Sequence, residues 1–256
     1  MEKNEVYIDF EAITNPFARL LNLPSGTPYA YTIGLLSDKN QYETKTFIIN
    51  FAMHNSLSSI WVILKKFIIA DITKINSKLN LKDIVFVGHN PVLETKCIKK
   101  IFPNNDVKPL IANQTVSLSK LTGKTFFNNY FPKIKKILLE KSKEYPLFLQ
   151  LIEKNGAIAS FAGYWLYTNS LTNLRSNDKK RKFYIDLDKK LLLKELKNYS
   201  KDDVNKMLYV IELEKNNLDL LIKEVNQKKE FLKILKSLNI NDNLTIKEIK
   251  DKIWSL

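Results

Sequence analysis

The chain has 256 residues, of which 45% are hydrophobic, and carries 41 Lys and Arg against 27 Asp and Glu, for a formal net charge of +14. This length suits one fairly large domain or a domain with an appendage, and the basic charge favours a polyanionic partner, first of all nucleic acid. The single cysteine, Cys97, excludes an internal disulfide, and its helix-like context indicates a buried structural thiol. The sequence shows neither a signal-peptide pattern nor an apolar run of membrane-spanning length, so we expect a cytoplasmic protein with no membrane partner.

The N-terminal part of the chain has the pattern of an antiparallel meander. The run Val6–Ile13 reads as a first strand, and two further strands are expected at Tyr29–Leu36 and Thr44–Phe51. Connections containing Pro, Gly, Asp and Asn separate the three runs, which is typical of strands joined by turns.

A helix and a buried strand are expected next. Apolar residues at helical spacing predict a helix over Ser56–Leu79, and the apolar run Ile84–Val87 predicts a buried parallel strand. Gly88–Pro91 ends that strand, Leu93–Phe102 reads as a helix, and Pro103–Val107 reads as a turn. The order β-β-β-α-β-α predicts an α/β fold with a mixed sheet flanked by helices, the order expected of a ribonuclease H-like sheet.

The rest of the chain is expected to be mainly helical. The region Val116–Ile152 reads as helical pieces, and helical periodicity dominates from Leu191 onward, with a break near Asn239–Asn243. We therefore expect a ribonuclease H-like domain over residues 1–210 and a helical C-terminal extension over residues 211–256.

Asp9 and Glu11 are the chemically informative residues of the first strand. Because side chains of a strand alternate between its faces, both acids point to the same face. Two adjacent carboxylates resist ionising together unless water or a divalent cation lies between them. Taken alone, the pair fits a strand that simply emerges into solvent, so its weight depends on two later segments.

Those segments place further acids where they could join the pair. In Val87–Glu94 a buried strand ends, the chain turns, and a helix begins with an acid in its first turn. Later in the chain, Tyr199 and Asp203 are four residues apart and share one helix face. Each segment alone also fits ordinary helix-start chemistry, in which an acid is favoured by the helix dipole.

Together, the three segments resemble the DEDD superfamily of DnaQ-like 3′–5′ exonucleases, which has a ribonuclease H-like fold. The chain looks like the Tyr-containing (DEDDy) branch, and like an uncharacterised bacterial branch with Glu in the second motif. Composition does not choose between the adjacent acids Asp202 and Asp203, but the resemblance selects Asp203. The three motifs are matched, in order, by Asp9 and Glu11 (D-x-E), by Asn90 to Glu94 (usually N-x-x-x-D) and by Tyr199 to Asp203 (Y-x-x-x-D).

The resemblance implies a metal-dependent 3′–5′ exonuclease that hydrolyses phosphodiester bonds of DNA or RNA, with single strands as the expected substrate. Two Mg²⁺ or Mn²⁺ ions, which prefer oxygen ligands, would activate water and stabilise the leaving oxygen. Tyr199 would orient the attacking water, because a phenol with a pKa of about 10 is a poor base at neutral pH. By resemblance, the metal ligands are Asp9, Glu11, Glu94 and Asp203.

Two alternative functions stay open at this point. A non-catalytic nucleic-acid-binding module could use the same fold, although such a module has no need to keep a carboxylate cluster. A factor that binds membrane surfaces or proteins would rest on charge alone, and no long amphipathic basic helix supports it. The basic clusters Lys133–Lys136 and Lys179–Lys182 could contact phosphates, but each also fits a solvated surface. The sequence does not indicate an oligomeric state.

Overall fold

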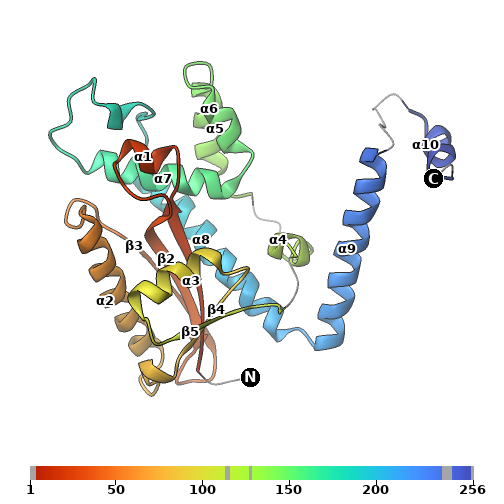
Figure 1. The fold of residues 1–256 in the computed structure, drawn as a ribbon, viewed down its shortest axis with the longest axis horizontal. Helices are drawn as coiled ribbons and strands as arrows, with labels where there is room; N and C mark the ends of the chain where they lie inside the picture. Colours follow the sequence, from red (N-terminus) through yellow and green to blue (C-terminus); the bar gives the residue numbers. More distant parts are fainter. Residues whose placement is uncertain (1–3, 113–115, 127–128, 238–243, 255–256) are drawn as a thin grey trace. The chain divides into compact units, whose positions relative to one another are not determined.

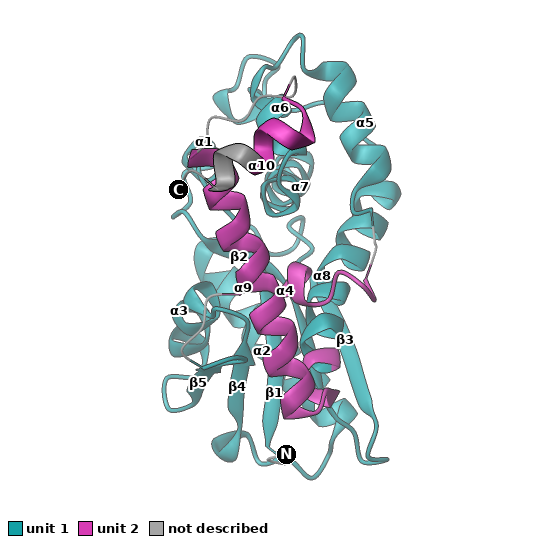
Figure 2. Ribbon diagram, turned by 90° about the vertical axis from the view of Figure 1, so that its right-hand side faces the viewer, with its two compact units in different colours: residues 1–113, 128–208 teal, residues 114–127, 209–256 magenta. Residues whose placement is uncertain are grey.

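The computed structural model describes residues 4–112, 116–126, 129–237 and 244–254. The chain divides into two units, residues 1–113 with 128–208 and residues 114–127 with 209–256 (Figure 2). The first unit contains the sheet and every site residue predicted above. Residues 114–127, which we assigned to the N-terminal domain, group instead with the C-terminal part, because the short helix Leu118–Leu121 packs against the helix Lys215–Ser237.

A five-stranded mixed sheet forms the centre of the first unit (Figure 1). Its strands are β1 (Glu5–Ile13), β2 (Thr27–Leu36), β3 (Tyr42–Ile48), β4 (Val85–Gly88) and β5 (Asp106–Pro109). The order across the sheet is β3-β2-β1-β4-β5. β2 is antiparallel to β1 and β3, whereas β4 is parallel to β1 and β5. The predicted α/β class, with a mixed sheet flanked by helices, is confirmed.

The helices of the first unit follow the strands in the predicted order. They are α1 (Phe17–Leu20), α2 (Leu57–Ile75), α3 (Val92–Ile101), α5 (Pro132–Lys141), α6 (Leu147–Ile152), α7 (Asn155–Asn169) and α8 (Lys189–Glu212), with 3-10 turns η1 (Leu81–Asp83) and η2 (Lys179–Arg181). Ser56 caps α2 by accepting a hydrogen bond from the backbone N–H of Ser59. α2 ends four residues before the predicted Leu79, because Asn76 leaves the helix and its side chain donates to the carbonyl of Leu36.

β5 is the strand that the sequence did not predict, since we expected a turn at Pro103–Val107. This four-residue edge strand has no apolar run, and an edge position tolerates Pro109. The side-chain amide of Asn105 donates to the carbonyls of Leu81 and Ile84 at 2.8 and 2.9 Å. These bonds hold the start of β5 next to the segment that leads into β4.

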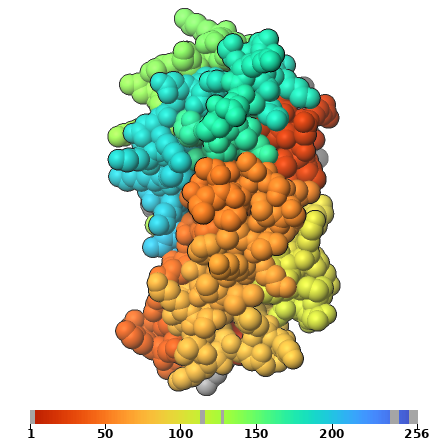
Figure 3. All heavy atoms as spheres, turned by 90° about the vertical axis from the view of Figure 1, so that its left-hand side faces the viewer, coloured from red at the N-terminus to blue at the C-terminus, as the bar shows by residue number. Residues whose placement is uncertain are grey.

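Helices cover both faces of the sheet. α2 lies on one face, where the Tyr31 hydroxyl donates to Asp71 at 2.7 Å, and Figure 3 shows α2, in orange, across the middle of this side of the first unit. α8 lies against the other face. There Gly34 allows close approach, because a Cβ atom on it would lie 2.8 Å from Cγ1 of Val204. Thr32, on the same face as Gly34, pairs with Asp9 across the strands. α8 therefore covers the face that carries the acids of β1.

The second unit is helical, with α4 (Leu118–Leu121), α9 (Lys215–Ser237) and α10 (Ile246–Trp254). Lys124 lies 3.3 Å from Glu224 of α9, and Thr245 forms a capping box with Glu248 at the start of α10. The predicted break at Asn239–Asn243 lies outside the described residues. Within the described ranges, every helix is too short or too polar to cross a membrane.

Candidate metal centre

β1 carries two of the predicted site residues side by side. Asp9 pairs with Thr32 and Glu11 with Ala30 of β2, so both side chains lie on the sheet face that α8 covers. A register shift between Glu11 and Ala12 interrupts the ladder directly after the second acid. Asp9 is half-buried and Glu11 is buried, so this pair is not a strand end emerging into solvent.

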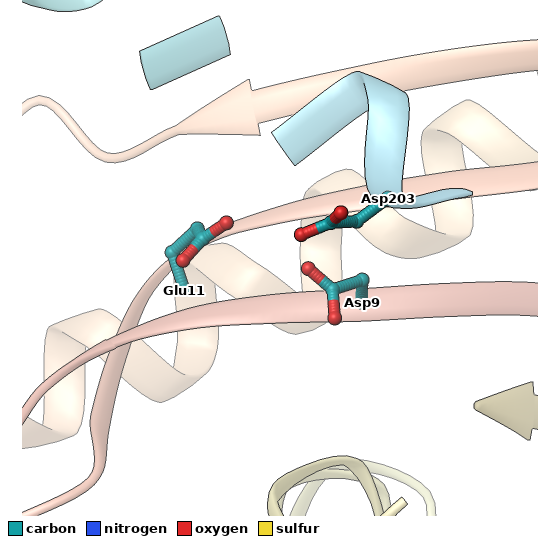
Figure 4. A group of neighbouring side chains, drawn as sticks. All are labelled: Asp9, Glu11 and Asp203. Atoms are coloured by element: carbon teal, nitrogen blue, oxygen red, sulfur yellow. The ribbon is translucent and has the colours of Figure 1, made fainter. Parts of the chain in front are cut away.

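α8 brings a third carboxylate to the pair. One carboxylate oxygen each from Asp9, Glu11 and Asp203 lies within 4.8 Å of the other two. Figure 4 shows the three carboxylates pointing toward one another, two from β1 and one from α8. Hard divalent cations prefer oxygen ligands of this kind, and this group could hold a metal ion.

The electrostatics of the group show a lack of positive charge. Burial, followed by the charges of neighbouring acids, holds the pKa of Asp9 well above its usual range. Burial and the charges of Asp203 and Glu94 raise the pKa of Glu11 to about 8, against a lowering by the hydrogen bond from Ser200. Among the described residues, Oε1 of Glu11 is buried without a hydrogen-bond partner. A buried acceptor of this kind is costly unless something donates or coordinates to it.

Glu94, the fourth predicted ligand, lies beside the group but outside it. Gly88 makes room for it, since a Cβ atom there would lie 3.1 Å from Cγ of Glu94. The Glu94 carboxylate accepts hydrogen bonds from its own backbone N–H and from that of Phe10, while burial raises its pKa. Its charge also contributes to the raised pKa values of Asp9 and Glu11. The structure thus brings together three of the four predicted ligands and holds the fourth against β1.

Tyr199 lies one helical turn before Asp203 and donates a hydrogen bond to it. Burial, then the charges of the surrounding acids, raises the pKa of this phenol above its ordinary value. The rings of Tyr130 and Phe131 pack against it, with centroids 5.3 and 5.2 Å away. The side chain is therefore a fixed, protonated hydroxyl, which can orient a neighbour but cannot act as a base near neutral pH.

Lys206 is the site residue that the sequence analysis missed. Its ammonium lies 2.7 Å from Oδ1 of Asp203, and its side chain is 2% exposed. It also lies over the ring of Tyr130, 4.7 Å from the centroid. Burial alone would lower the pKa of Lys206, but the attraction of Asp203 and hydrogen bonds to Asp203 and Tyr130 outweigh it and raise the pKa. The i,i+3 spacing was visible in the sequence, but the burial of the pair was not.

A short hydrogen-bonded chain fixes α8 above the sheet. The hydroxyl of Ser200 lies 2.9 Å from that of Thr32, which in turn lies 2.8 Å from the hydroxyl of Thr46. Thr32 is the cross-strand partner of Asp9. These bonds therefore set the height and rotation of α8 at the point where it delivers Asp203.

The prediction that Cys97 is a buried structural thiol is confirmed. The side chain is buried against the core, and burial raises the pKa of its thiol to about 12, so it stays protonated and unreactive near neutral pH.

Compared with protein-family models, with curated proteins and with solved structures, the chain has no match.

Proposed function

We propose that this chain is a divalent-metal-dependent phosphodiesterase acting on nucleic acid, and specifically a 3′–5′ exonuclease of the DEDD type on a ribonuclease H-like domain. The observation that carries the proposal is the convergence of Asp9, Glu11 and Asp203 within 4.8 Å, from a strand and a helix far apart in the chain. The β-β-β-α-β-α element order and the resemblance of the three motifs support the same proposal.

The donor set fits hard divalent cations such as Mg²⁺ or Mn²⁺, two of which are expected. Asp9, Glu11 and Asp203 would hold them directly, and Glu94 would do so by releasing the Phe10 backbone N–H to which it is now bonded. When bound, such ions supply an activated water and charge stabilisation for the leaving oxygen.

The protein's own residues would position the reactants. Tyr199 keeps its proton and donates to Asp203, which leaves its oxygen lone pairs able to accept a hydrogen bond from the attacking water. Lys206 fixes the carboxylate of Asp203 in one orientation, so the ligand need not be ordered when a substrate arrives.

A non-catalytic nucleic-acid-binding module is the second candidate, and one observation favours it. The buried pair of Lys206 and Asp203 supplies part of the missing positive charge without any metal. Even so, one ammonium opposes four acids, and the buried Oε1 of Glu11 has no described partner. The metal ions of the hydrolytic function would supply the positive charge that these acids still lack, whereas a binding module leaves them uncompensated.

The test is hydrolysis of a labelled single-stranded oligonucleotide, DNA or RNA, by the purified chain. Shortening is expected with Mg²⁺ or Mn²⁺ and none with EDTA. Asp203→Asn should remove nearly all hydrolysis. Its neighbour Asp202→Asn should retain most of it, because Asp202 lies outside the carboxylate group and is bonded to the Tyr130 hydroxyl at 3.2 Å. Activity that survives chelation would refute the metal mechanism, and inactivity on both substrates would favour the binding module.

A further inference from the structure

A groove of about 580 Å³ runs between α8 and the segment that enters α5, within the first unit. Its size falls in the range of ligand-binding clefts. The wall from α8 is a stripe of polar residues three or four apart, a spacing that places them on one helix face. The side chains of interest here are Lys133, Lys194, Lys201, Asn129, Asn198 and Asn205.

The three lysines give the groove its positive charge. All three are exposed, and no carboxylate of the described chain forms an ion pair with them. The acids in the groove wall are already engaged. Glu195 accepts hydrogen bonds at 3.2 Å from the backbone N–H groups of Lys133 and Ile134, at the start of α5. Asp202 accepts hydrogen bonds from the hydroxyl of Tyr130 at 3.2 Å and from the side-chain amide of Asn205 at 3.5 Å.

Tyr130 connects the groove to the carboxylate group. It lines the groove, its ring packs on Tyr199, and the ammonium of Lys206 lies over it. At about 100° per residue around α8, Lys194 and Lys201 lie about 140° and about 160° from Tyr199. A linear polymer bound in the groove would thus pass over Tyr130 to reach Asp203. The part that contacts the lysines would lie away from the bond that is cleaved.

We propose that this groove binds the phosphates of a single-stranded nucleic acid, several bonds away from the one that is cleaved. Lysines neutralise phosphates without reading sequence, and the amides beside them can donate to phosphate or base oxygens. Specific duplex binding buries about 1,000–2,500 Å² of protein surface, which exceeds what one narrow groove offers. This inference rests on the proposed function for the identity of its ligand.

The test compares two double variants with the same change of charge. Lys194→Gln with Lys201→Gln removes two groove lysines. Lys66→Gln with Lys74→Gln removes two exposed lysines of α2, on the opposite face of the sheet. Binding of a short 5′-labelled oligothymidylate, and of oligouridylate, is measured by fluorescence anisotropy in EDTA, where metal-dependent cleavage cannot occur, across a series of salt concentrations.

The groove variant should bind several-fold more weakly at low salt. Its plot of log affinity against log salt should be shallower by about 1.4, since each phosphate contact to a single strand contributes about 0.7. The α2 variant should match the unsubstituted chain. Any of four results would overturn the groove assignment. Both variants could bind equally weakly, or the groove variant could bind as well as the unsubstituted chain. The unsubstituted chain could fail to bind, or it could bind a duplex as well as a single strand.

Hydrolysis distinguishes this proposal from the proposed function. Binding that depends on the groove, without hydrolysis in Mg²⁺ or Mn²⁺, would support the groove and refute the nuclease. Metal-dependent hydrolysis with unchanged binding and unchanged KM in the groove variant would refute the groove and leave the nuclease standing.

Discussion

Replacing Lys206 by Met tests whether the carboxylate group lacks positive charge. Met has a similar length and fills the same buried space, but it removes the ammonium that lies 2.7 Å from Asp203. Breaking a buried ion pair by removing one partner costs about 3–5 kcal/mol, because the other charge stays behind. The side chain of Asp203 is 22% exposed, so water screens it in part, and we expect a loss near the lower limit, about 3 kcal/mol.

The assay is urea unfolding of the metal-free chain, followed by tryptophan fluorescence. Trp61 and Trp165 lie in the first unit, where Trp165 is buried and stacks on Tyr184, so two of the three tryptophans report on the unit that contains the site. Lys197→Met is the matched control, since Lys197 is exposed on the same helix and should change stability by no more than about 0.5 kcal/mol.

Saturating Mn²⁺ should then recover most of the loss in Lys206→Met, because a bound divalent cation supplies the missing charge and stabilises the folded state that binds it. In an Asp203→Asn background the same substitution should cost much less, because the pair is already broken. A metal-free Lys206→Met chain as stable as the parent would refute the role given to the pair. If Lys206→Met lost as much free energy of unfolding in Mn²⁺ as it does without metal, no cation would bind beside Asp203.

Three further predictions concern the same group. In metal-free buffer at alkaline pH, Asp9→Asn should leave the free energy of unfolding unchanged or raise it by about 1–2 kcal/mol, because it removes one of several carboxylates that repel one another. A clear fall in melting temperature would show a structural role for Asp9. The pKa of Glu11 is about 8 when folded against 4.5 unperturbed, so the folded state holds a proton that the unfolded state releases. Metal-free stability should therefore fall from about pH 4.5 to pH 8, and a Glu11→Gln chain with an undiminished slope would contradict this cause. Tyr199→Phe should hydrolyse oligonucleotides at a rate between those of the parent and Asp203→Asn, because it loses an orienting hydroxyl and no ligand; an inactive Tyr199→Phe would mean that the phenol does more than orient.

The sequence predicted the central strands because each is an apolar run whose side chains are buried in the sheet, as in β1 and β4. It did not predict β5, whose four residues owe their extended form to pairing with β4 and to the bonds from Asn105. The sequence could not predict the grouping of residues 114–127 with the C-terminal helices either, because this grouping depends on contacts between distant segments.

The site shows the same division between local and distant causes. Side chains of a strand alternate between its two faces, which predicted that Asp9 and Glu11 lie on one face, and the strand pairing in the structure places them there. The choice of Asp203 over Asp202 came from the motif resemblance, and the structure places Asp203 in the carboxylate group while Asp202 bonds to Tyr130. That bond and the burial of Lys206 depend on Tyr130, which reaches α8 from about seventy positions earlier in the chain. Local patterns carry no signal for such a contact.

The charges around Asp203 also bear on the divalent cation that we propose for this group. Three of the four acids, Asp9, Glu11 and Glu94, have pKa values raised chiefly by burial, so over part of the pH range they hold protons in the metal-free protein that they would release in water. Lys206 pairs with Asp203 and also lowers the pKa of Asp9, but that pKa still stays well above its usual range. A divalent cation would replace those protons and coordinate the unpaired oxygen of Glu11. A monovalent partner such as a second lysine would supply a single positive charge, which is not enough to replace all of these protons. Metal binding should therefore release protons, and isothermal titration with Mn²⁺ in buffers of different ionisation enthalpy should show a buffer-dependent heat; an unchanged heat would exclude coordination by the protonated acids.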